Sequence, residues 1–338
     1  MLAYALTDTS QSQYDPKGKI FLMDFDNKQK DRFLGERKRR VNALCYCPNL
    51  GLFDTGNYTR VYTNNDMGDS LDSYALSGLF RVLDSRGRLV NKPIISVEHD
   101  YEKSRKSLEE VLKKEKFHTG LINDLCFVPE KGLIGIASNG IYLLVDSTNR
   151  LVINRFIDSR DDADRIMKYI PQLGIVCSSQ LSSTLSGEIE CYDLNGNSKN
   201  IGRFDNSKGK VIFEWTEGWN VPDDLKKRGF GNTTSYGGAR DIAWVPNLGM
   251  YVADDDGLRF CIKPSGEIVD KRITNKKFRN LCFVPNRGLI GVDMGCGKLR
   301  RILDERGNVT LEDIKINPLE SKGGFDEISA LTAIPKNF

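Results

Sequence analysis

Six polar side chains recur at one fixed place in this sequence, six residues before a proline that ends an apolar run. They are Asn42, Asn123, Arg165, Arg240, Arg279 and Ser329. Guanidinium groups bind carboxylates and phosphates through paired hydrogen bonds, and amide and hydroxyl groups supply further donors. If the fold brings the six positions together, we expect them to bind a polar or anionic ligand.

Carboxylate and amide side chains gather near the same positions. They are Asp124, Asp241 and Asn280, one residue further on, and Asp254, Asp255, Asp256 and Asp293 at the ends of later apolar runs. Oxygen donors of this kind hold hard cations such as Ca²⁺. A plainer interpretation is that strand ends meeting solvent are simply polar. The residues alone leave an anion site, a cation site and a solvated rim all open.

A repeated phrase reveals the elements that must position these residues. It consists of an apolar run, a proline, two variable residues, a glycine and a second apolar run. Its copies are 41–53, 122–136, 164–176, 240–252 and 279–292, with a truncated copy at 327–335. The residue before proline favours an extended conformation, proline presets the φ of a turn, and glycine accepts positive φ. Each copy therefore predicts a strand–turn–strand hairpin.

Two further strands follow each hairpin, so one unit has four strands and about 40 residues, which is typical of a β-propeller blade. We expect an all-β fold: a six-bladed β-propeller with four-stranded blades, forming a single domain over 1–338. The expected blades are 327–338 with 1–36, 40–97, 121–157, 163–204, 239–273 and 278–314. Strands from both chain ends share the first blade and close the ring. A degenerate seventh blade within 205–238 is the alternative.

Side-chain alternation gives the expected packing of these blades. In the first strand of each hairpin, large residues such as Leu125 and Phe127 alternate with small ones such as Cys126. Because successive strand residues point to opposite faces, we expect the large face of one blade to pack on the small face of its neighbour.

Long insertions fall only between the second and third strands of a blade, or between one blade and the next. They are 57–77, 98–119, 180–187, 205–238 and 315–326. Such connections share one face of a propeller, and a decorated face of this kind usually binds ligands or partners. The helical spacing of Tyr101, Leu108 and Val111 predicts a helix within 98–119. The six polar positions should surround the channel mouth on this same face.

Charge and composition narrow the class of protein. The 49 basic and 46 acidic residues give a formal charge of +3, which argues against a general polyanion binder. Two local basic runs, Arg37, Lys38, Arg39 and Arg40 and then Lys276 and Lys277, nevertheless offer RNA as a partner. The sequence has neither a secretory signal nor a long apolar span, and its eight cysteines mostly fit buried, reduced thiols. We expect a cytoplasmic protein without a membrane partner.

Residues 249–268 and 288–308 carry a more specific pattern: an apolar strand, an aspartate at its end, a glycine turn, an arginine-bearing strand and a second glycine turn. In this the chain resembles the NHL-repeat and SMP-30 (strictosidine-synthase-like) six-bladed propellers. The NHL resemblance implies binding of proteins or RNA through one face. The SMP-30 resemblance implies a divalent-metal-dependent lactonase or esterase with Asn123, Asp241 and Asn280 as metal ligands, but strand 2–7 lacks the glutamate of that metal site.

No other catalytic signature occurs in the sequence, and both histidines, His99 and His118, lie in one insertion. The leading hypothesis is therefore a non-enzymatic propeller that binds a protein or a polar ligand through its decorated face, with no cofactor. The metal-dependent hydrolase and the RNA-binding propeller are the alternatives.

Overall fold

A computed structural model describes most of the chain. The described residues are 1–8, 17–27, 31–37, 40–63, 72–95, 122–137, 140–158, 164–171, 173–180, 187–205, 210–212, 239–254, 257–265, 267–316 and 326–336. Every helix or strand assigned among them is a β-strand. The expected helix in 98–119 and most of the long insertions lie outside these residues. Within the described part of the chain, no helix has the length and apolar character needed to cross a membrane.

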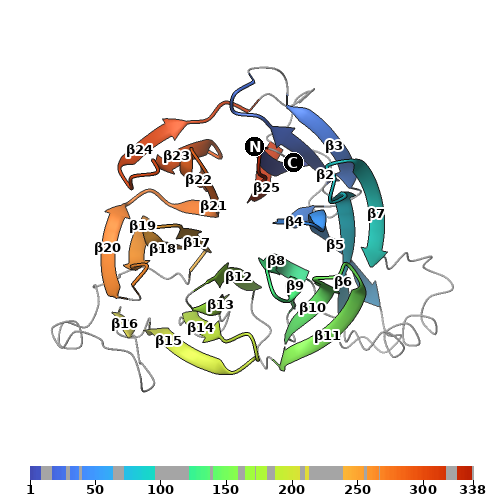
Figure 1. Ribbon diagram of the computed structural model, residues 1–338, viewed down its shortest axis with the longest axis horizontal. Helices are drawn as coiled ribbons and strands as arrows, with labels where there is room; N and C mark the ends of the chain where they lie inside the picture. The colour runs from blue at the N-terminus through green and yellow to red at the C-terminus, as the bar shows by residue number, and fades with distance from the viewer. Residues whose placement is uncertain are drawn as a thin grey trace. The chain divides into compact units, whose positions relative to one another are not determined.

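The strands form six antiparallel sheets, each built from consecutive strands except where the chain ends meet (Figure 1). The protein is thus an all-β, six-bladed β-propeller, as the repeat predicts. One sheet has the order β25-β1-β2-β3, so the last strand of the chain pairs with the first. The sheet that begins with β12 gains a fifth strand, β16. Residues 213–238, where a seventh blade was the alternative, lie outside the described part.

The contacts within the chain group these sheets into two compact units. One unit comprises 1–2, 161–317 and 333–336, and the other comprises 3–160, 318–332 and 337–338.

The first unit holds three sheets. Their strands are β12 (Asp164–Ile170), β13 (Gly174–Gln180), β14 (Gly187–Tyr192), β15 (Ser198–Asp205) and β16 (Lys210–Ile212); β17 (Asp241–Val245), β18 (Gly249–Asp254), β19 (Gly257–Ile262) and β20 (Ile268–Thr274); and β21 (Phe278–Val284), β22 (Gly288–Asp293), β23 (Leu299–Leu303) and β24 (Val309–Asp313).

The second unit holds the remaining strands, except that Leu2 of β1 and Ala333 of β25 belong to the first unit. These are β25 (Asp326–Ala333), β1 (Leu2–Asp8), β2 (Lys17–Met23) and β3 (Arg32–Arg37); β4 (Val41–Cys47), β5 (Gly51–Thr63), β6 (Asp72–Leu83) and β7 (Leu89–Ile95); and β8 (Ile122–Val128), β9 (Gly132–Ala137), β10 (Gly140–Asp146) and β11 (Leu151–Asp158).

The proline–glycine hairpins explain why the repeated phrase is so regular. In the hairpin between β4 and β5, Leu50 N–H donates to the carbonyl of Cys47 at 3.0 Å across Pro48. Gly51 then has φ +115°, and a Cβ atom there would lie 2.1 Å from the carbonyl oxygen of Leu83. The glycines that begin β9, β13, β18 and β22 also have positive φ, and a Cβ atom on each would likewise collide with a carbonyl oxygen of the third strand. Glycine is required for both reasons.

Neighbouring sheets pack as the side-chain alternation predicts. In the second unit, the small residues Ala43, Cys45 and Cys47 of β4 share one apolar cluster with Leu125 of β8, and Phe127 packs against it. In the first unit, small Ala243 of β17 likewise clusters with Leu281 of β21. Large faces therefore meet small faces between adjacent blades, which lets the sheets approach closely.

A second repeated device, which the proline–glycine phrase does not reveal, holds the turns between third and fourth strands. In the turn after β23, the Asp304 carboxylate accepts hydrogen bonds from the backbone N–H of Arg306 and Asn308 and from the Asn308 side chain, at 2.8–2.9 Å. Asp84, Asp146 and Asp193 make the same contacts in three other blades. An aspartate of this kind accepts hydrogen bonds from backbone N–H groups of the turn, which would otherwise need water as their acceptor.

These aspartates predict an acid dependence of stability. The side-chain hydrogen bond from Asn308 is the main cause that lowers the pKa of Asp304, and hydrogen bonds from Arg88 and Arg150 lower the pKa of Asp84 and Asp146. A carboxylate with a lowered pKa stabilises the fold above its unfolded value of about 4, and this stabilisation is lost as the pH falls through the folded pKa. We expect the free energy of unfolding to fall below about pH 4, and to fall less steeply in Asp304→Asn. Urea unfolding across the acid range measures both slopes, and equal slopes would contradict this role.

The outer strands carry a bulge at corresponding places. Asn91 in β7, Ile153 in β11 and Leu311 in β24 have φ values of 43°, 45° and 54°. Each lies near a shift in the register of pairing with the third strand. Positive φ is costly for bulky and β-branched residues, so the bulges are enforced by the surrounding sheet. They bend the open edge of each of these three blades.

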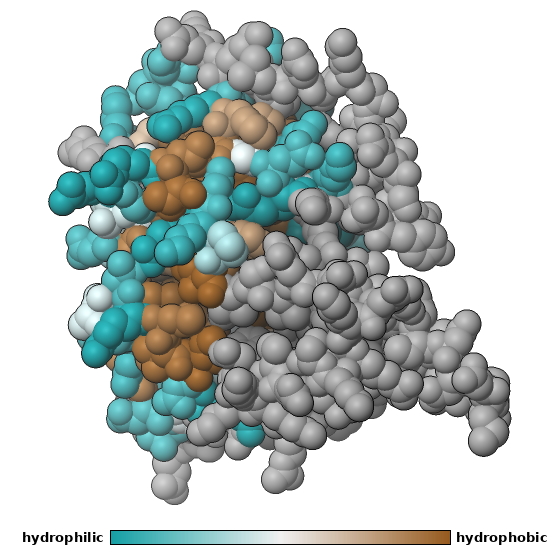
Figure 2. Space-filling model, turned by 90° about the vertical axis from the view of Figure 1, so that its right-hand side faces the viewer, coloured by the Kyte–Doolittle hydropathy of each residue, from teal (hydrophilic) through white to brown (hydrophobic). Residues whose placement is uncertain are grey.

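Exposed hydrophobic residues are scattered over several strands. They are Phe33, Leu89, Val90, Leu151, Val152, Met294 and Val309. On the side of the molecule drawn in Figure 2, the described hydrophobic residues form small brown patches bordered by hydrophilic residues. Such a mixed surface is usual for a folded protein and needs no binding role.

Candidate functional site

The six predicted ligand-binding positions lie at the starts of the innermost strands. Asn42, Asn123, Arg165, Arg279 and Ser329 belong to β4, β8, β12, β21 and β25, and Arg240 precedes β17 by one residue. Asn42, Asn123, Arg240 and Arg279 are half-buried, Ser329 is buried, and the side chain of Arg165 lies outside the described part. Arg165, Arg240 and Arg279 belong to the first unit, and Asn42, Asn123 and Ser329 to the second. That these six side chains surround one channel mouth remains a prediction.

Asp241, a predicted metal ligand, serves to join strands. Its carboxylate accepts hydrogen bonds from its neighbour Ile242 N–H at 2.7 Å and from Leu281 N–H in β21. The Lys168 ammonium in β12 lies 3.7 Å from the same carboxylate. These contacts link three neighbouring sheets within the first unit and give both carboxylate oxygens a protein partner. A cation would have to compete with these donors.

The other two predicted ligands are asparagines, and the metal site that the three residues would form remains a prediction. Asn280 lies next to Leu281 in β21, and Asn123 belongs to the second unit. Among the described residues, no group of three or more histidine, cysteine, aspartate or glutamate side chains is arranged to hold a metal ion.

The acidic ends of the second strands form ion pairs with arginines across the following turn. Arg259 Nε in β19 donates to Asp254 Oδ2 of β18 at 2.8 Å, and both side chains are less than 10% exposed. In the next blade, Arg300 Nε of β23 lies 3.1 Å from Asp293 Oδ2 of β22. This explains the aspartate–glycine–arginine pattern of residues 249–268 and 288–308. Asp255 and Asp256 lie outside the described residues.

Part of the first basic run, offered above as an RNA contact, is bound by acidic groups of the protein itself. The Arg37 guanidinium points inward and forms a bidentate ion pair with the Asp54 carboxylate: Nε donates to Oδ1 at 3.2 Å and Nη2 donates to Oδ2 at 2.6 Å. It also lies over the ring of Phe80, 4.8 Å from the centroid. Arg40 forms an ion pair with Glu327 at 3.2 Å. Arg37 is therefore a packing residue; Lys38 and Arg39 lie outside the described part.

The second basic run borders an open pocket. A cavity of about 560 Å³ in the first unit is lined by Lys276, Lys277, Asp293, Met294, Gly295, Cys296 and Arg300. It forms where the link between β20 and β21 meets the turn between β22 and β23, and Met294 N–H donates to the Lys277 carbonyl at 3.0 Å. The β20–β21 segment links two blades, and the β22–β23 turn joins the second and third strands of one blade. The sequence predicts that both kinds of connection lie on the decorated face.

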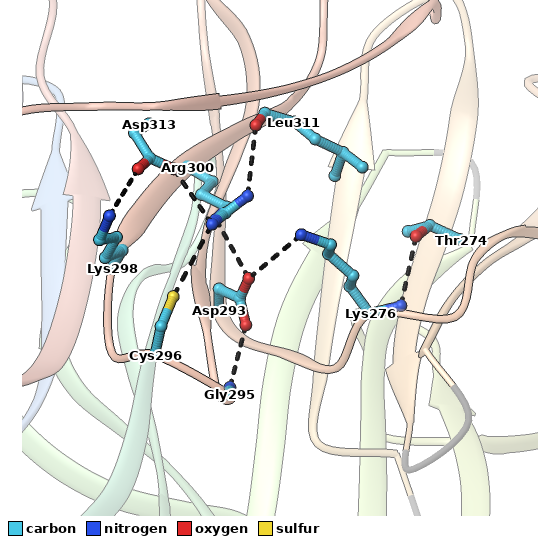
Figure 3. Close-up of polar contacts among 9 residues, drawn as sticks. All are labelled: Thr274, Lys276, Asp293, Gly295, Cys296, Lys298, Arg300, Leu311 and Asp313. Atoms are coloured by element: carbon cyan, nitrogen blue, oxygen red, sulfur yellow. Dashed lines mark hydrogen bonds and ion pairs between the residues drawn. The ribbon is translucent and has the colours of Figure 1, made fainter.

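Arg300 builds the wall of this pocket (Figure 3). Besides Asp293, its guanidinium contacts the Leu311 carbonyl at 3.4 Å, Cys296 Sγ at 3.8 Å and Asp313 Oδ1 at 3.2 Å. Lys298 Nζ also donates to Asp313 at 2.8 Å, and this hydrogen bond is the main cause that lowers the pKa of Asp313 and raises the pKa of Lys298. The Arg300 guanidinium thus contacts four groups of the protein: Asp293, Asp313, the Leu311 carbonyl and Cys296 Sγ.

The two lysines are held more loosely. Lys276 Nζ lies 3.9 Å from Asp293 Oδ2, an oxygen already paired with Arg300, and its side chain is 41% exposed. Lys277 is exposed, and within the described part of the chain its ammonium forms no ion pair. The pocket therefore presents two cationic groups to solvent.

Cys296, in the β22–β23 turn, departs from the expectation of buried thiols. It is the one exposed cysteine of the eight, all of which are described and none of which forms a disulfide. Cys282 is half-buried, and burial raises the pKa of its thiol to about 12. The sequence signal for Cys296 is that it alone lies between two glycines, Gly295 and Gly297, rather than in an apolar run.

Comparisons with known proteins add little to this description. No protein-family model matches the chain, and no curated protein does. A solved structure of a protein from Lactobacillus plantarum is similar over 98% of this chain and 99% of its own length, with 12% identity and a TM-score of 0.47. A protein of unknown function from Bacteroides caccae aligns with 63% of this chain and 86% of its own length, with 14% identity and a TM-score of 0.34. The NHL and SMP-30 resemblance remains a prediction.

Proposed function

We propose that this protein is a non-enzymatic binding propeller that recognises an anion-bearing ligand through the face formed by the second-to-third-strand turns and the links between blades. The observation that carries the proposal is the open pocket beside β22 and β23, in which Lys276 and Lys277 face solvent while Asp293 and Arg300 neutralise one another. A cavity of about 560 Å³ has the size of a small-molecule site.

The contrast between the two kinds of turn supports this choice of face. In four blades the turn between the third and fourth strands is short and is closed by its own aspartate, as at Asp304. The β22–β23 turn instead exposes Met294, Gly295 and Cys296 beside two lysines. Function commonly resides in connections of the second kind, which a rigid sheet holds in place.

A thermal-shift panel tests the proposal. Small carboxylates, sulfates and phosphates are added to the wild type and to the double variant Lys276→Glu/Lys277→Glu. Because a ligand that binds only the folded state stabilises it, at least one anion should raise the melting temperature of the wild type by a few degrees. The double variant should show no such rise.

The matched control is Lys271→Glu in β20, an exposed lysine outside the pocket, which should respond like the wild type. If no anion stabilises the wild type, or if the pocket variant is stabilised equally, the proposed function is wrong.

A further inference from the structure

We infer that this pocket, on the proposed binding function, selects a doubly charged anion of the phosphate monoester type, held by Lys276 and Lys277. The inference rests on how the charges around the pocket are distributed. Lys276, Lys298 and Arg300 pair with two carboxylates, Asp293 and Asp313, and Lys277 lines the pocket as a fourth cation. Four cations against two anions leave a net charge of +2.

The ion pairs show where this excess charge resides. Lys298 and Arg300 share Asp313 at 2.8 and 3.2 Å, and Arg300 also holds Asp293 at 3.1 Å. The guanidinium is 15% exposed, and its remaining contacts go to Leu311 and Cys296. Arg300 therefore cannot turn towards a ligand without leaving Asp293, a carboxylate that is only 9% exposed, without its closest cation. The excess positive charge is carried by Lys276 and Lys277, which are consecutive in the sequence and line the pocket across from Arg300.

Two lysines that line the same pocket suit a dianion. Lysine acts as a point charge with three rotatable donors, so it tolerates the varied oxygen geometry of a phosphate or sulfate group. A monoanion would neutralise only one of the two charges. Since each solvent-screened pair contributes little, the expected preference for a dianion is about tenfold in Kd.

Cys296 gives a direct readout. It is exposed in the pocket, whereas the other seven cysteines are buried or half-buried, so neutral iodoacetamide should alkylate it selectively. A ligand beside Lys276 and Lys277 should slow this alkylation. The ligand concentration that halves the rate, followed by mass spectrometry of the intact protein, then gives a Kd.

The two probes are phenyl phosphate and phenyl sulfate, which share a ring and an oxyanion but differ in charge. The phosphate monoester has a second pKa of about 6, so it is largely a dianion at about pH 7.5 and largely a monoanion at about pH 5. We expect phenyl phosphate to protect Cys296 about tenfold more strongly than phenyl sulfate at the higher pH, and about equally at the lower pH. Lys276→Ala/Lys277→Ala should remove the protection, while Lys271→Ala should retain it.

Each outcome decides a separate statement. Equal protection by the two probes at about pH 7.5 would overturn the dianion preference and leave the proposed function standing. Protection that survives in Lys276→Ala/Lys277→Ala would overturn the assignment to these lysines. If neither probe protects the wild type, the dianion inference is wrong; the proposed function falls only if the thermal-shift panel also fails. The substituted lysines are at the surface, so unchanged melting temperatures without ligand should verify that the variants fold.

Discussion

Deleting residues 327–338 is expected to abolish the single cooperative unfolding transition of this protein. The deletion removes nearly all of β25, which supplies the innermost strand of the sheet β25-β1-β2-β3. Ile328, Ala330 and Ile334 are each at most 3% exposed, and Thr332 Oγ1 accepts a hydrogen bond from Tyr46 N–H in β4. Without β25, strand β1 becomes an edge strand that lacks its partner on one side, although its residues Leu2–Leu6 are all buried.

Circular dichroism during thermal unfolding measures this effect. The truncated chain should show a broad, low-temperature loss of signal and should bind a dye for exposed hydrophobic surface. Adding the missing segment as a synthetic peptide should sharpen the transition again, because β25 is a sheet neighbour of β1 and can pair with it as a separate strand. An unchanged melting curve after truncation would show that the shared terminal sheet is not needed for stability.

Replacing Arg37 with methionine is expected to destabilise the fold by about 3–5 kcal/mol at neutral pH. The Asp54 side chain is completely buried, and Arg37 is its bidentate partner. Burial raises the pKa of Asp54, while the charge and hydrogen bonds of Arg37 oppose that rise. Removing the arginine leaves a buried carboxylate without its cation, so its pKa should rise further.

The pH dependence of this variant has a definite sign. A carboxyl group with a raised folded pKa favours the fold in its protonated form, and this advantage is lost as the pH rises through that folded pKa. The destabilisation in Arg37→Met should therefore be greatest at neutral pH and shrink on acidification, as urea unfolding at several pH values would measure. A defect that is independent of pH would assign Arg37 a purely apolar packing role against Phe80.

Two matched variants complete the test. Arg37→Met/Asp54→Leu removes both charges together and should recover most of the lost stability, since a buried ion pair is often replaceable by apolar residues. Arg40→Met breaks the neighbouring ion pair with Glu327, whose side chains are 43% and 28% exposed, and should cost less than about 1 kcal/mol. If Arg40→Met were as damaging as Arg37→Met, burial would not be the deciding factor.

The features that could be predicted from the sequence depend on residues that lie close together in the chain. The hairpins are local, because Pro48 and Gly51 set their own turn, and six copies make the four-stranded repeat plain. The shared sheet of β25 and β1 follows from counting strands at the two chain ends. The large-on-small packing follows from the alternation of residues such as Leu125 and Cys126.

The features that escaped prediction depend on partners distant in sequence or on unequal burial. Arg37 and Lys276 both belong to basic runs, yet only Arg37 has a fully buried aspartate, Asp54 in β5, within reach. The pocket needs the register that brings residues 276–277 beside the β22–β23 turn, which no local spacing encodes. Asp304 and its equivalents were visible in the sequence, but they lie in turns rather than beside the prolines that revealed the repeat.

One turn departs from the aspartate pattern in a way that bears on protein engineering. After β19, Lys263 stands where the other turns have aspartate, and Glu267 stands four residues later. Lys263 Nζ donates to Glu267 Oε2 at 2.7 Å, and Lys263 N–H donates to the Glu267 carbonyl at 2.8 Å, as Asp304 N–H does to Asn308. The backbone turn thus accepts either polarity of the pair. For a redesigned blade, the lysine–glutamate pair of this turn and the aspartate–arginine pair of Asp84 and Arg88 are therefore interchangeable ways to close the same five-residue turn.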